Sequence, residues 1–431
     1  MATPRRLAAL LAASAIAIAA CGSNDGGNGS AGASTAPGQS AAPASQAPAV
    51  STGTVSGELT VWGMGNEGAK LDVLAKDFMA QNPDVKVNVT PVDWGQAVAK
   101  LQTAIGGKQT PDISQMGTDM MGQFATTGAL EPVPSNFDPS TYFESAWNTG
   151  VVDGTAYGVP WYVETRLLYY RTDIAEKAGI TQPPTTWDEL KAMAKAMQEK
   201  GGAQWGISLG TKNYQELAPF IWSNGGDIYN GTEFTLDSPQ AVDALTFYDS
   251  FFKEGLAPKS VPEGFDITPA FVKGTHPMFF SGPWHIGLIK DAGGADIEGK
   301  WAVAPIPKKD SATSFVGGSN MVVFKDSKNK DAAWAFLQYL SDPATQVKWY
   351  QEATDLPAVQ SAWDDATLKD DKDVQMFGEQ LSETKAPPAI STWSEIADAI
   401  NQSMEKVTTG DETPEKGAQE MQQQAESIGT G

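Results

Sequence analysis

Hydrophobic and polar positions alternate along the chain with two different periods. A short apolar segment over 57–62 predicts a strand, and apolar residues at helical spacing over 67–79 predict a helix. Valines alternate with polar residues over 85–90, as in a strand with one face in water. A helix over 97–105 and a strand that starts at Pro111 follow. This β-α-β-α-β order predicts a mostly parallel sheet with helices on both faces.

A comparable alternation resumes after Tyr157, where a second set of elements begins. A helix is predicted to start at Trp187, with Thr185 and Thr186 as capping residues. Four aromatic residues at helical spacing are expected to belong to the core: Trp187, Trp334, Phe336 and Tyr339. Removal of the first 20 of the 431 residues leaves 411, which is too many for one core. The sequence therefore predicts an α/β fold with two lobes that are not copies of one unit.

The first 20 residues have the pattern of a secretory signal peptide. Arg5 and Arg6 precede an apolar stretch over 7–20 that is too short to cross a bilayer. Cys21, the only cysteine of the chain, directly follows small residues, and this resembles the lipobox of bacterial lipoproteins. The resemblance implies that the thiol is acylated and anchors the protein to the outer face of the cell membrane. The alternative is an ordinary signal peptide that leaves Cys21 as a free or buried thiol.

Residues 21–56 predict a disordered tether. The segment is rich in Gly, Ser, Ala, Pro and Gln and has scarcely an aliphatic side chain, so burial cannot offset the entropy of ordering it. A flexible coil of this length spans roughly 30 Å from end to end. Such a tether would hold the folded part of the protein clear of the lipid headgroups.

The chain is strongly acidic, with 52 Asp and Glu against 30 Lys and Arg and a formal net charge of −22. A surface of this charge repels nucleic acid and anionic lipid, so we expect neither as a partner. After the signal, no apolar run reaches the length of a transmembrane helix. Contact with the membrane is therefore expected through the lipid anchor only.

Residues 63–68 match the G-x-G-x-x-G pattern of dinucleotide-binding proteins and lie between a predicted strand and a predicted helix. The carboxylate of Glu67 would occupy the place where a pyrophosphate needs backbone N–H donors, which argues against that function. We interpret the segment as a glycine-rich loop whose Asn66 and Glu67 face a ligand. No cofactor is expected.

Sequence signatures of catalytic and metal sites are missing. The two histidines, His276 and His285, lack Cys or paired carboxylates at ligand spacing, and there is neither a G-x-S-x-G motif nor a P-loop. We therefore expect no metal, no catalytic residue and no enzymatic activity. A surface glycoside hydrolase stays an alternative, since Asp93, Asp119 and Glu164 could supply the carboxylate pair that such an enzyme needs.

Aromatic residues beside polar residues in loops stand out as the candidate ligand site. Trp94, Trp161 and Trp284 lie at the ends of predicted elements beside Gly or Pro, where a core is thin. Rings at such places can stack on the C–H face of a sugar, while neighbouring Asp, Glu, Asn and Arg side chains bind its hydroxyls. The segment 222–227 (WSNGGD) has the same composition. This pattern favours a small-ligand site that accepts carbohydrate.

Four segments then occur in a fixed order: 157–171 (YGVPW to LLYYR), 184–190 (PTTWDEL), 278–284 (MFFSGPW) and 315–320 (FVGGSN). In this order, and behind a lipobox, they resemble the extracellular solute-binding proteins of ABC sugar importers, the family of maltose-binding protein. The resemblance covers nearly all of the chain after residue 56. It implies two α/β lobes, joined by a hinge that the chain crosses more than once, with the ligand in the cleft between them.

The same resemblance implies lobe boundaries and site residues. Lobe one would take 57–162 and 316–355, and lobe two 163–315 and 356–431. The stacking tryptophan of the family corresponds to Trp284, and Glu164 and Arg166 correspond to an acid and an arginine at the hinge rim. A looser correspondence extends to Asn66, Glu67, Asp93, Trp94, Thr118, Asp119, Trp222, Gly318 and Ser319.

The functional hypothesis is a lipid-anchored, monomeric receptor that binds an oligosaccharide and delivers it to the membrane permease of an ABC importer. Its mechanism is closure of the two lobes around the sugar, without chemical turnover. The alternative within the same fold is a binding protein for another solute such as a polyamine, whose site would need acids enclosed by aromatic rings.

Overall fold

The computed structural model describes residues 55–431. The predicted signal peptide, the lipid acceptor Cys21 and nearly all of the tether lie outside the described residues. No helix within 55–431 has the length and apolar character needed to cross a membrane.

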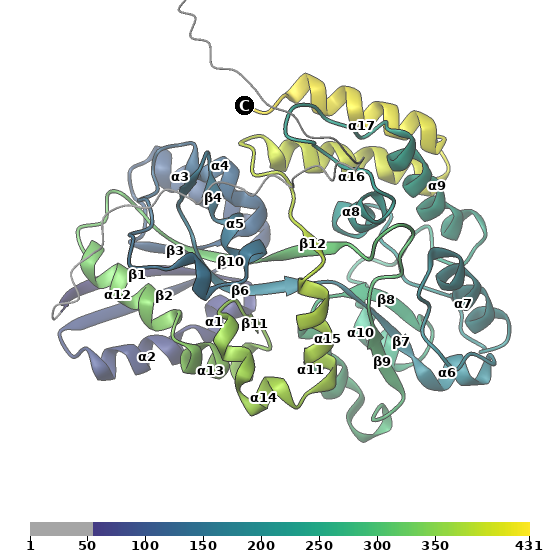
Figure 1. Ribbon diagram of the computed structural model, residues 1–431, viewed down its shortest axis with the longest axis horizontal. Helices are drawn as coiled ribbons and strands as arrows, with labels where there is room; N and C mark the ends of the chain where they lie inside the picture. The colour runs from purple at the N-terminus through teal and green to yellow at the C-terminus, as the bar shows by residue number, and fades with distance from the viewer. Residues whose placement is uncertain (1–54) are drawn as a thin grey trace, which may run out of the picture. The chain divides into compact units, whose positions relative to one another are not determined.

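The larger of the two main sheets has seven strands and combines parallel and antiparallel pairs (Figure 1). Its strands are β1 (Gly57–Met64), β2 (Val85–Val92), β3 (Ile113–Gly117), β6 (Val159–Thr165), β10 (Ser314–Val323), β11 (Leu356–Pro357) and β12 (Thr384–Lys385). The predicted parallel strands are confirmed, because β1 pairs in parallel with both β2 and β3. The prediction of a mostly parallel sheet is wrong for the rest of the sheet, because β10 pairs antiparallel with β3 on one side and β6 on the other, and β11 pairs antiparallel with the outer edge of β6. The short β12 pairs in parallel with β10.

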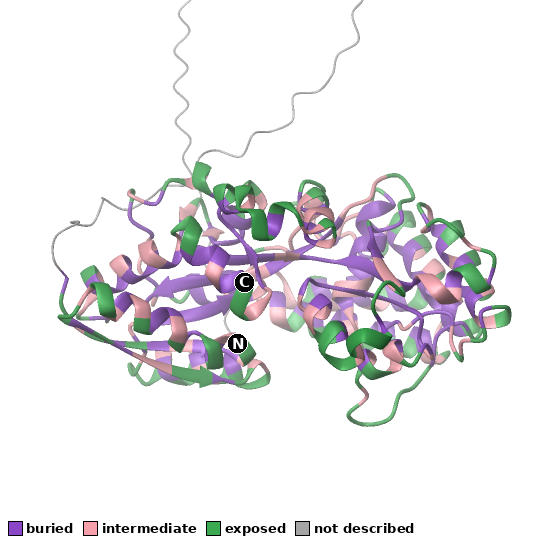
Figure 2. Ribbon diagram, turned by 90° about the horizontal axis from the view of Figure 1, so that it is seen from below, coloured by how far each residue is buried: buried purple, intermediate pink, exposed green. Residues whose placement is uncertain are grey.

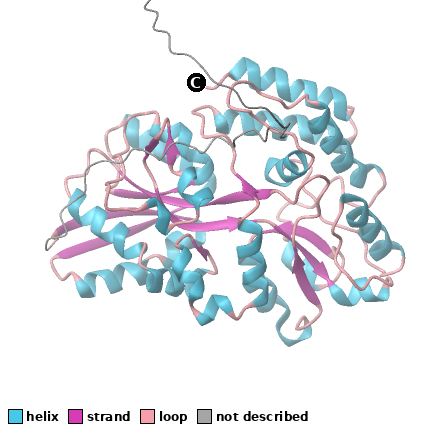
Figure 3. Ribbon diagram, in the orientation of Figure 1, coloured by secondary structure: helices cyan, strands magenta, loops and turns pink. Residues whose placement is uncertain are grey.

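Helices connect the parallel strands and flank the larger sheet (Figure 3). They are α1 (Gly65–Lys70), α2 (Asp72–Gln81), α3 (Trp94–Gly106), η1 (Thr118–Met120), α4 (Met121–Ala125), η2 (Pro139–Thr141), α5 (Glu144–Thr149), α12 (Lys330–Leu340) and α13 (Pro343–Ala353). The predicted β-α-β-α-β order is confirmed. The helix predicted over 67–79 is present as two consecutive helices, α1 and α2, which meet at Leu71.

The smaller sheet has three antiparallel strands in the order β8-β7-β9. These strands are β7 (Leu167–Arg171), β8 (Met278–Ser281) and β9 (Trp301–Ala304). Around them lie α6 (Thr172–Lys177), α7 (Trp187–Glu199), α8 (Tyr214–Ser223), α9 (Pro239–Lys253), α10 (Ile267–Val272), α11 (Trp284–Gly293) and η3 (Gly294–Asp296). The start of α7 is as predicted, because the Thr186 hydroxyl accepts a hydrogen bond from the Glu189 N–H at 3.3 Å.

The strands β3, β6, β7, β8 and β10 are almost entirely buried, whereas β2 at the edge of the larger sheet has exposed residues, and further exposed residues lie on the outward faces of the helices (Figure 2). The predicted core positions Trp187, Trp334 and Phe336 are buried, and Tyr339 is partly buried against Phe78 and Phe336. A separate short hairpin joins β4 (Val151–Val152) to β5 (Thr155–Ala156).

Three chain segments pass between the two sheets and are joined at Ser314. The chain leaves β6 and enters β7 through Arg166, and it returns from β9 to β10 at Ser314. The Ser314 hydroxyl donates to the Arg166 carbonyl at 2.9 Å and accepts from the Arg166 N–H at 3.3 Å. The Ser314 N–H donates to the carbonyl of Glu383 at 3.0 Å, next to β12. Ser314 therefore joins the β6–β7 and β9–β10 connections to the third segment, which runs from Glu383 through β12 toward α16.

The C-terminal part of the chain contains η4 (Gln360–Asp364), α14 (Ala366–Lys369), α15 (Lys372–Leu381), α16 (Trp393–Thr409) and α17 (Pro414–Ile428). α16 and α17 pack against each other and against α9, as Figure 1 shows. β11 instead pairs with Tyr162 and Val163 of the larger sheet, although the expected boundary assigns 356–431 to the second lobe. The lobe boundaries themselves stay a prediction.

Candidate ligand-binding cleft

A cleft of about 830 Å³ opens at the edge of the larger sheet where β1, β2 and β3 end. The first residues of α1, α3 and η1 line it on that side, and α11 lines it from the smaller sheet. Ligands of open α/β sheets bind at the carboxyl ends of the parallel strands, and a volume of this size is typical of a small-molecule site. The lining residues are Gly65, Asn66, Glu67, Lys70, Pro91, Val92, Asp93, Trp94, Gly117, Thr118, Asp119, Met120, Tyr162, Glu164, Gln215, Trp284, Gly287, Leu288, Asp291, Phe315, Gly317, Gly318, Ala353, Thr354 and Asp355.

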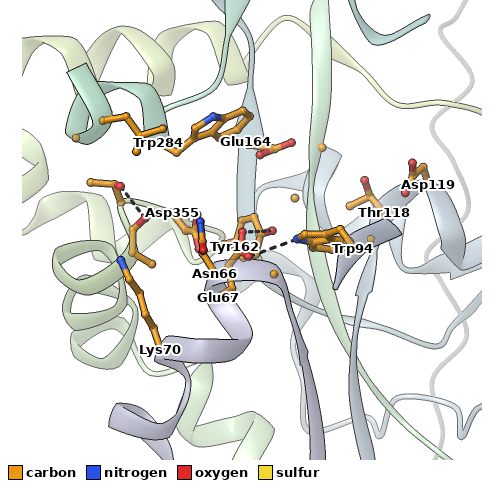
Figure 4. Close-up of a pocket in the computed structure, with 18 of the residues that line it drawn as sticks. Asn66, Glu67, Lys70, Trp94, Thr118, Asp119, Tyr162, Glu164, Trp284 and Asp355 are labelled. Atoms are coloured by element: carbon orange, nitrogen blue, oxygen red, sulfur yellow. Dashed lines mark hydrogen bonds between the residues drawn. The ribbon is translucent and has the colours of Figure 1, made fainter. Parts of the chain in front are cut away.

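Trp94 forms part of the wall on the side of the parallel strands (Figure 4). It is the first residue of α3, whose N-cap Asp93 accepts a hydrogen bond from the Gly95 N–H at 2.9 Å. The indole Nε1 donates to Oε2 of Glu67 at 3.4 Å. A Cβ on Gly65, which has a φ of +53°, would lie 2.5 Å from Cδ1 of the ring. Glycine at this position therefore lets the indole lie close to the backbone.

Tyr162 places its hydroxyl beside Glu67 at the end of a hydrogen-bonded chain. Gln115 donates to the Ser319 hydroxyl at 3.0 Å, Ser319 donates to the Tyr162 hydroxyl at 3.2 Å, and Tyr162 donates to Oε1 of Glu67 at 3.4 Å. Gln115 and Ser319 are buried in the sheet. The chain fixes both the tyrosine and the carboxyl from behind the cleft wall.

Trp284 starts α11 and faces the cleft from the other side (Figure 4). Gly287, Leu288 and Asp291 follow on the same helix face and also line the cleft, and Leu288 is 45% exposed. Behind the ring, the carbonyl of Gly282 accepts a hydrogen bond from the Tyr169 hydroxyl at 2.6 Å. α11 thus presents an apolar wall that is open to solvent.

Gly282 offers a test of how Trp284 is placed. A Cβ at this position would overlap the six-membered ring of Trp284, so Gly282→Ala must displace the indole. We expect the variant to weaken ligand binding about tenfold, or about 1.4 kcal/mol, while every cleft-lining side chain stays present. Titration calorimetry measures the change, with Gly106→Ala as the control, because Gly106 has no positive φ and its added Cβ meets nothing within 4 Å. Unchanged affinity in Gly282→Ala would mean that the indole position is unimportant.

Arg166 lies behind the cleft wall and is only 9% exposed. Its guanidinium forms an ion pair with Glu164 at 3.0 Å and donates to Oε1 of Gln215 at 3.1 Å. It also lies 4.9 Å from the ring centre of Trp284 and 5.2 Å from that of Phe315. All four partners line the cleft, so Arg166 holds several of its side chains in place at once.

Burial changes the acidity of three carboxyls in the cleft. It raises the pKa of Asp355, which is only 5% exposed, well above its usual range. Burial likewise raises the pKa of Glu67 and of Asp119. Hydrogen bonds from the Trp349 indole to Asp355 at 3.1 Å and from the Tyr214 hydroxyl to Asp119 at 3.3 Å lower these values only in part.

The raised pKa of Asp355 predicts a pH-dependent stability. The folded-state pKa lies above the ordinary value of 3.8, so the folded protein holds the proton more tightly than the unfolded chain. The stability that this carboxyl contributes is full below about pH 3.8 and is lost as the pH rises through the folded pKa. Asp355→Asn should therefore have a higher free energy of unfolding than the wild type at pH 7.5, with the gain disappearing by pH 4. Urea denaturation at several pH values tests this, with the exposed Asp72→Asn as control; no gain at pH 7.5 contradicts it.

The structure brings together most of the residues predicted for the site. Those that line the cleft are Asn66, Glu67, Asp93, Trp94, Thr118, Asp119, Glu164, Trp284 and Gly318. Arg166 and Ser319 lie directly behind it, in contact with lining residues. Trp222 is buried in the core around α8 and does not line the cleft.

Trp161 also does not line the cleft but is 2% exposed and stacked on Trp349, with 4.5 Å between ring centres. The reason is the period of two residues in a strand. Tyr162 and Glu164 of β6 face the cleft, so Trp161 and Val163 must face the other side of the sheet.

Sequence reasoning missed six polar residues of the cleft: Lys70, Tyr162, Gln215, Asp291, Thr354 and Asp355. Tyr162 could have been found by counting two residues back from Glu164 along the predicted strand. Nothing in the sequence singles out the others, which reach the cleft from several elements. Within residues 55–431, no group of His, Cys, Asp and Glu side chains is arranged to hold a metal ion.

Comparison with known proteins assigns the class to which this fold and cleft belong. Residues 62–347 match the family of bacterial extracellular solute-binding proteins, and the chain belongs to that family. The two-lobed α/β fold expected from the family resemblance is thereby confirmed.

Individual relatives agree with this assignment. The structure of the sugar-binding protein MalE from Xanthomonas citri is similar with a TM-score of 0.80 and 32% identity, over 86% of this chain and 97% of that one. The GacH receptor of Streptomyces glaucescens, solved also in complex with acarbose, has a TM-score of 0.80 and 27% identity, over 87% and 98% of the two chains. The maltotriose-binding protein of Pyrococcus abyssi is 28% identical, over 80% of this chain and 77% of the relative.

Proposed function

We propose that this protein is a carbohydrate receptor, anchored by a lipid at Cys21, which delivers an oligosaccharide to the permease of an ABC importer. The observation that carries the proposal is the cleft itself. Indole rings from both sides, Trp94 and Trp284, share its wall with carboxyl, amide and hydroxyl groups. Aromatic faces with a few aimed polar groups are the usual composition of a site that binds a small polar molecule.

The relatives support carbohydrate as the ligand class. Two of the three compared proteins carry a sugar in their names, and the third binds acarbose. Their likeness extends over at least 80% of this chain and at least 77% of each partner. The finer points of sugar length, linkage and anomer depend on the loops that line the cleft.

Binding would act by shifting the balance between an open and a closed arrangement. Trp94 lies at the larger sheet and Trp284 at the smaller one, so a sugar that contacts both stabilises closure. The three passages joined at Ser314 provide the place where the chain can bend. A permease would then distinguish the closed receptor from the open one, and no bond in the sugar is broken.

The N-terminal segments would determine where the receptor acts. An acylated Cys21 would fix it to the outer face of the cell membrane, and the tether over 21–56 would let a monomeric receptor reach a permease in the same membrane. Mass spectrometry of the protein purified from its membrane fraction tests this point. An unmodified Cys21 thiol contradicts the anchor and leaves the sugar-binding function standing.

Two alternatives make different predictions. A polyamine receptor would bind through the acidic side chains between the aromatic rings, with strong dependence on salt. A glycoside hydrolase would use two of the carboxylates Asp93, Asp119 and Glu164, and would release reducing sugar from a bound oligosaccharide. The relatives are named as binding proteins or receptors, which favours a function without turnover.

A melting-temperature screen of the purified protein tests the proposal. Monosaccharides and oligosaccharides form the panel, and polyamines and peptides are the controls. A ligand at about 100 times its dissociation constant stabilises the native state by roughly 2.7 kcal/mol, which moves the midpoint visibly. A shift with one class of sugar is expected. A shift with a polyamine and none with any sugar would contradict the proposed function but not the fold.

A further inference from the structure

The polar wall of the cleft is unbalanced in charge. The lining residues include one basic side chain, Lys70, against six acidic ones: Glu67, Asp93, Asp119, Glu164, Asp291 and Asp355. The amino group of Lys70 donates to the carbonyl of Glu352 at 2.7 Å, so it is directed partly toward the backbone. Some of these carboxyls can accept hydrogen bonds from sugar hydroxyls, but the excess of acidic over basic side chains also suits a ligand with positive charge.

Four of these acidic residues, here called the inner carboxyls, are Glu67, Asp119, Glu164 and Asp355, and they differ in their hydrogen-bond and ion-pair partners. Glu164 has Arg166 as an ion-pair partner. For Glu67, Asp119 and Asp355, the side-chain donors seen among residues 55–431 are all uncharged. These donors are the indoles of Trp94 and Trp349 and the hydroxyls of Tyr162 and Tyr214. A buried carboxylate without a cationic partner is unfavourable, and a titratable group perturbed by burial in a cleft is a candidate for contact with a ligand.

The inner carboxyls also act on one another. Glu67 and Glu164 each raise the pKa of Asp355 beyond the effect of burial, and Lys70 lowers it less than these two raise it. Glu164 raises the pKa of Glu67 as well. Asp93 at the N-terminus of α3 and Asp291 on α11 add exposed negative charge on both sides of the cleft. Ionisation of Glu67 or Asp355 is therefore unfavourable in the empty cleft, and a bound cation would favour it.

We propose that the cleft selects an oligosaccharide that carries a protonated amine, an amino sugar, over its neutral and acidic counterparts, and that Glu67 and Asp355 select it. This inference rests on the proposed carbohydrate-binding function and narrows its ligand class. An ammonium group donates charge-assisted hydrogen bonds to carboxylates, which are roughly twice as strong as those of a hydroxyl. The same carboxylates repel a uronate or a sugar phosphate.

The exchange of a proton for an ammonium group gives the inference a distinct signature. In the empty cleft, burial favours the protonated form of Glu67 and Asp355. A bound ammonium favours the carboxylate, so each group that ionises releases one proton to the solvent, and no covalent bond in the ligand changes. A neutral sugar brings no positive charge into the cleft, so it does not favour the carboxylate form. Binding of the amine should therefore release protons, and binding of its neutral analogue should release fewer.

Titration calorimetry of the full chain at pH 6.0, in two buffers of different ionisation enthalpy, measures both affinity and proton release. The first matched pair is the β-1,4-linked glucosamine tetramer against cellotetraose, which differ at the 2-position of each ring. The second is 1-amino-1-deoxymaltotetraitol against maltotetraitol. In the pair whose linkage fits the cleft, we expect the amine to bind at least tenfold more tightly at low ionic strength. Added salt should reduce the difference.

Variants assign the preference to individual carboxyls. Glu67→Gln keeps the shape of the side chain and removes its charge, so the ratio of amine to neutral affinity should fall to within about threefold. Glu379→Gln, an exposed glutamate on α15 away from the cleft, is the matched control and should keep the full ratio. Asp355→Asn provides the same test if Glu67→Gln does not fold. Proton release by the wild-type chain needs no variant.

The outcomes separate this inference from the proposed function. If a neutral sugar binds as tightly as its amine partner, or if only neutral sugars bind, the amine preference is wrong and the carbohydrate receptor stands. If no sugar of either pair or of the wider panel binds but spermidine does, both the receptor function and the inference are wrong.

Discussion

Replacing Trp284 with alanine is expected to lower the affinity for the preferred sugar by about 2–4 kcal/mol, or roughly 30- to 1,000-fold, as for a buried aromatic anchor. The indole is the first residue of α11 and supplies the apolar wall on the side of the smaller sheet. Its removal leaves the sugar with an aromatic contact on the Trp94 side only. It also takes away one of the two rings that the Arg166 guanidinium faces.

Titration calorimetry measures this loss, and circular dichroism checks that the variant is folded. Trp363→Ala is a suitable control, because Trp363 is partly buried, packs on Phe143 and lies outside the cleft. It should cost stability and leave the affinity unchanged. Trp284→Phe should recover part of the loss. Full affinity in a folded Trp284→Ala variant would place the ligand elsewhere.

Arg166→Ala is expected to lower the free energy of unfolding by about 3 kcal/mol, because it leaves Glu164 without its cationic partner in a buried setting. The two side chains are 10% and 17% exposed, so water screens the pair poorly. The substitution also removes the hydrogen bond to Gln215 and the contacts with the Trp284 and Phe315 rings. Denaturant unfolding gives the change in stability, and calorimetry should show weaker ligand binding as well.

Two further variants isolate the electrostatic part of this effect. In Glu164→Gln combined with Arg166→Met, no uncompensated charge remains, so stability should return in part toward the wild-type value. Lys86→Ala breaks the exposed pair between Lys86 and Glu58, whose side chains are 64% and 59% exposed, and should change stability far less than Arg166→Ala does. A loss for Arg166→Ala no larger than that for Lys86→Ala would show that the buried pair contributes little.

The local parts of the fold could be predicted because their signals are local. Alternating valines specify β2, helical spacing specifies α3, and a threonine before Trp187 specifies the start of α7. The antiparallel half of the larger sheet could not be predicted in this way. β10 lies between β3 and β6, and this pairing joins residues about 150 to 200 positions apart, as the contact of Ser319 with Gly117 and Tyr162 illustrates.

In the cleft, too, some residues could be predicted from local sequence patterns, and others are placed by contacts between distant parts of the chain. Trp94 and Trp284 could be found because each is an aromatic residue at the start of a helix beside Gly or Pro and polar residues. Trp161 has similar neighbours in the sequence, but the register of β6 turns it into the core. Asp355 follows α13 and reaches the cleft through the position of that helix against α1, so no local pattern identifies it.

The position of β10 in the larger sheet has a consequence for the order in which the protein is made. When synthesis has reached residue 313, the facing edges of β3 and β6 exist, but the strand that joins them does not. Unpaired edges of buried strands associate readily with other chains. The larger sheet therefore cannot close until residue 323 is available. A pause before residue 314 thus leaves an intermediate with two unpaired strand edges, which is prone to aggregation.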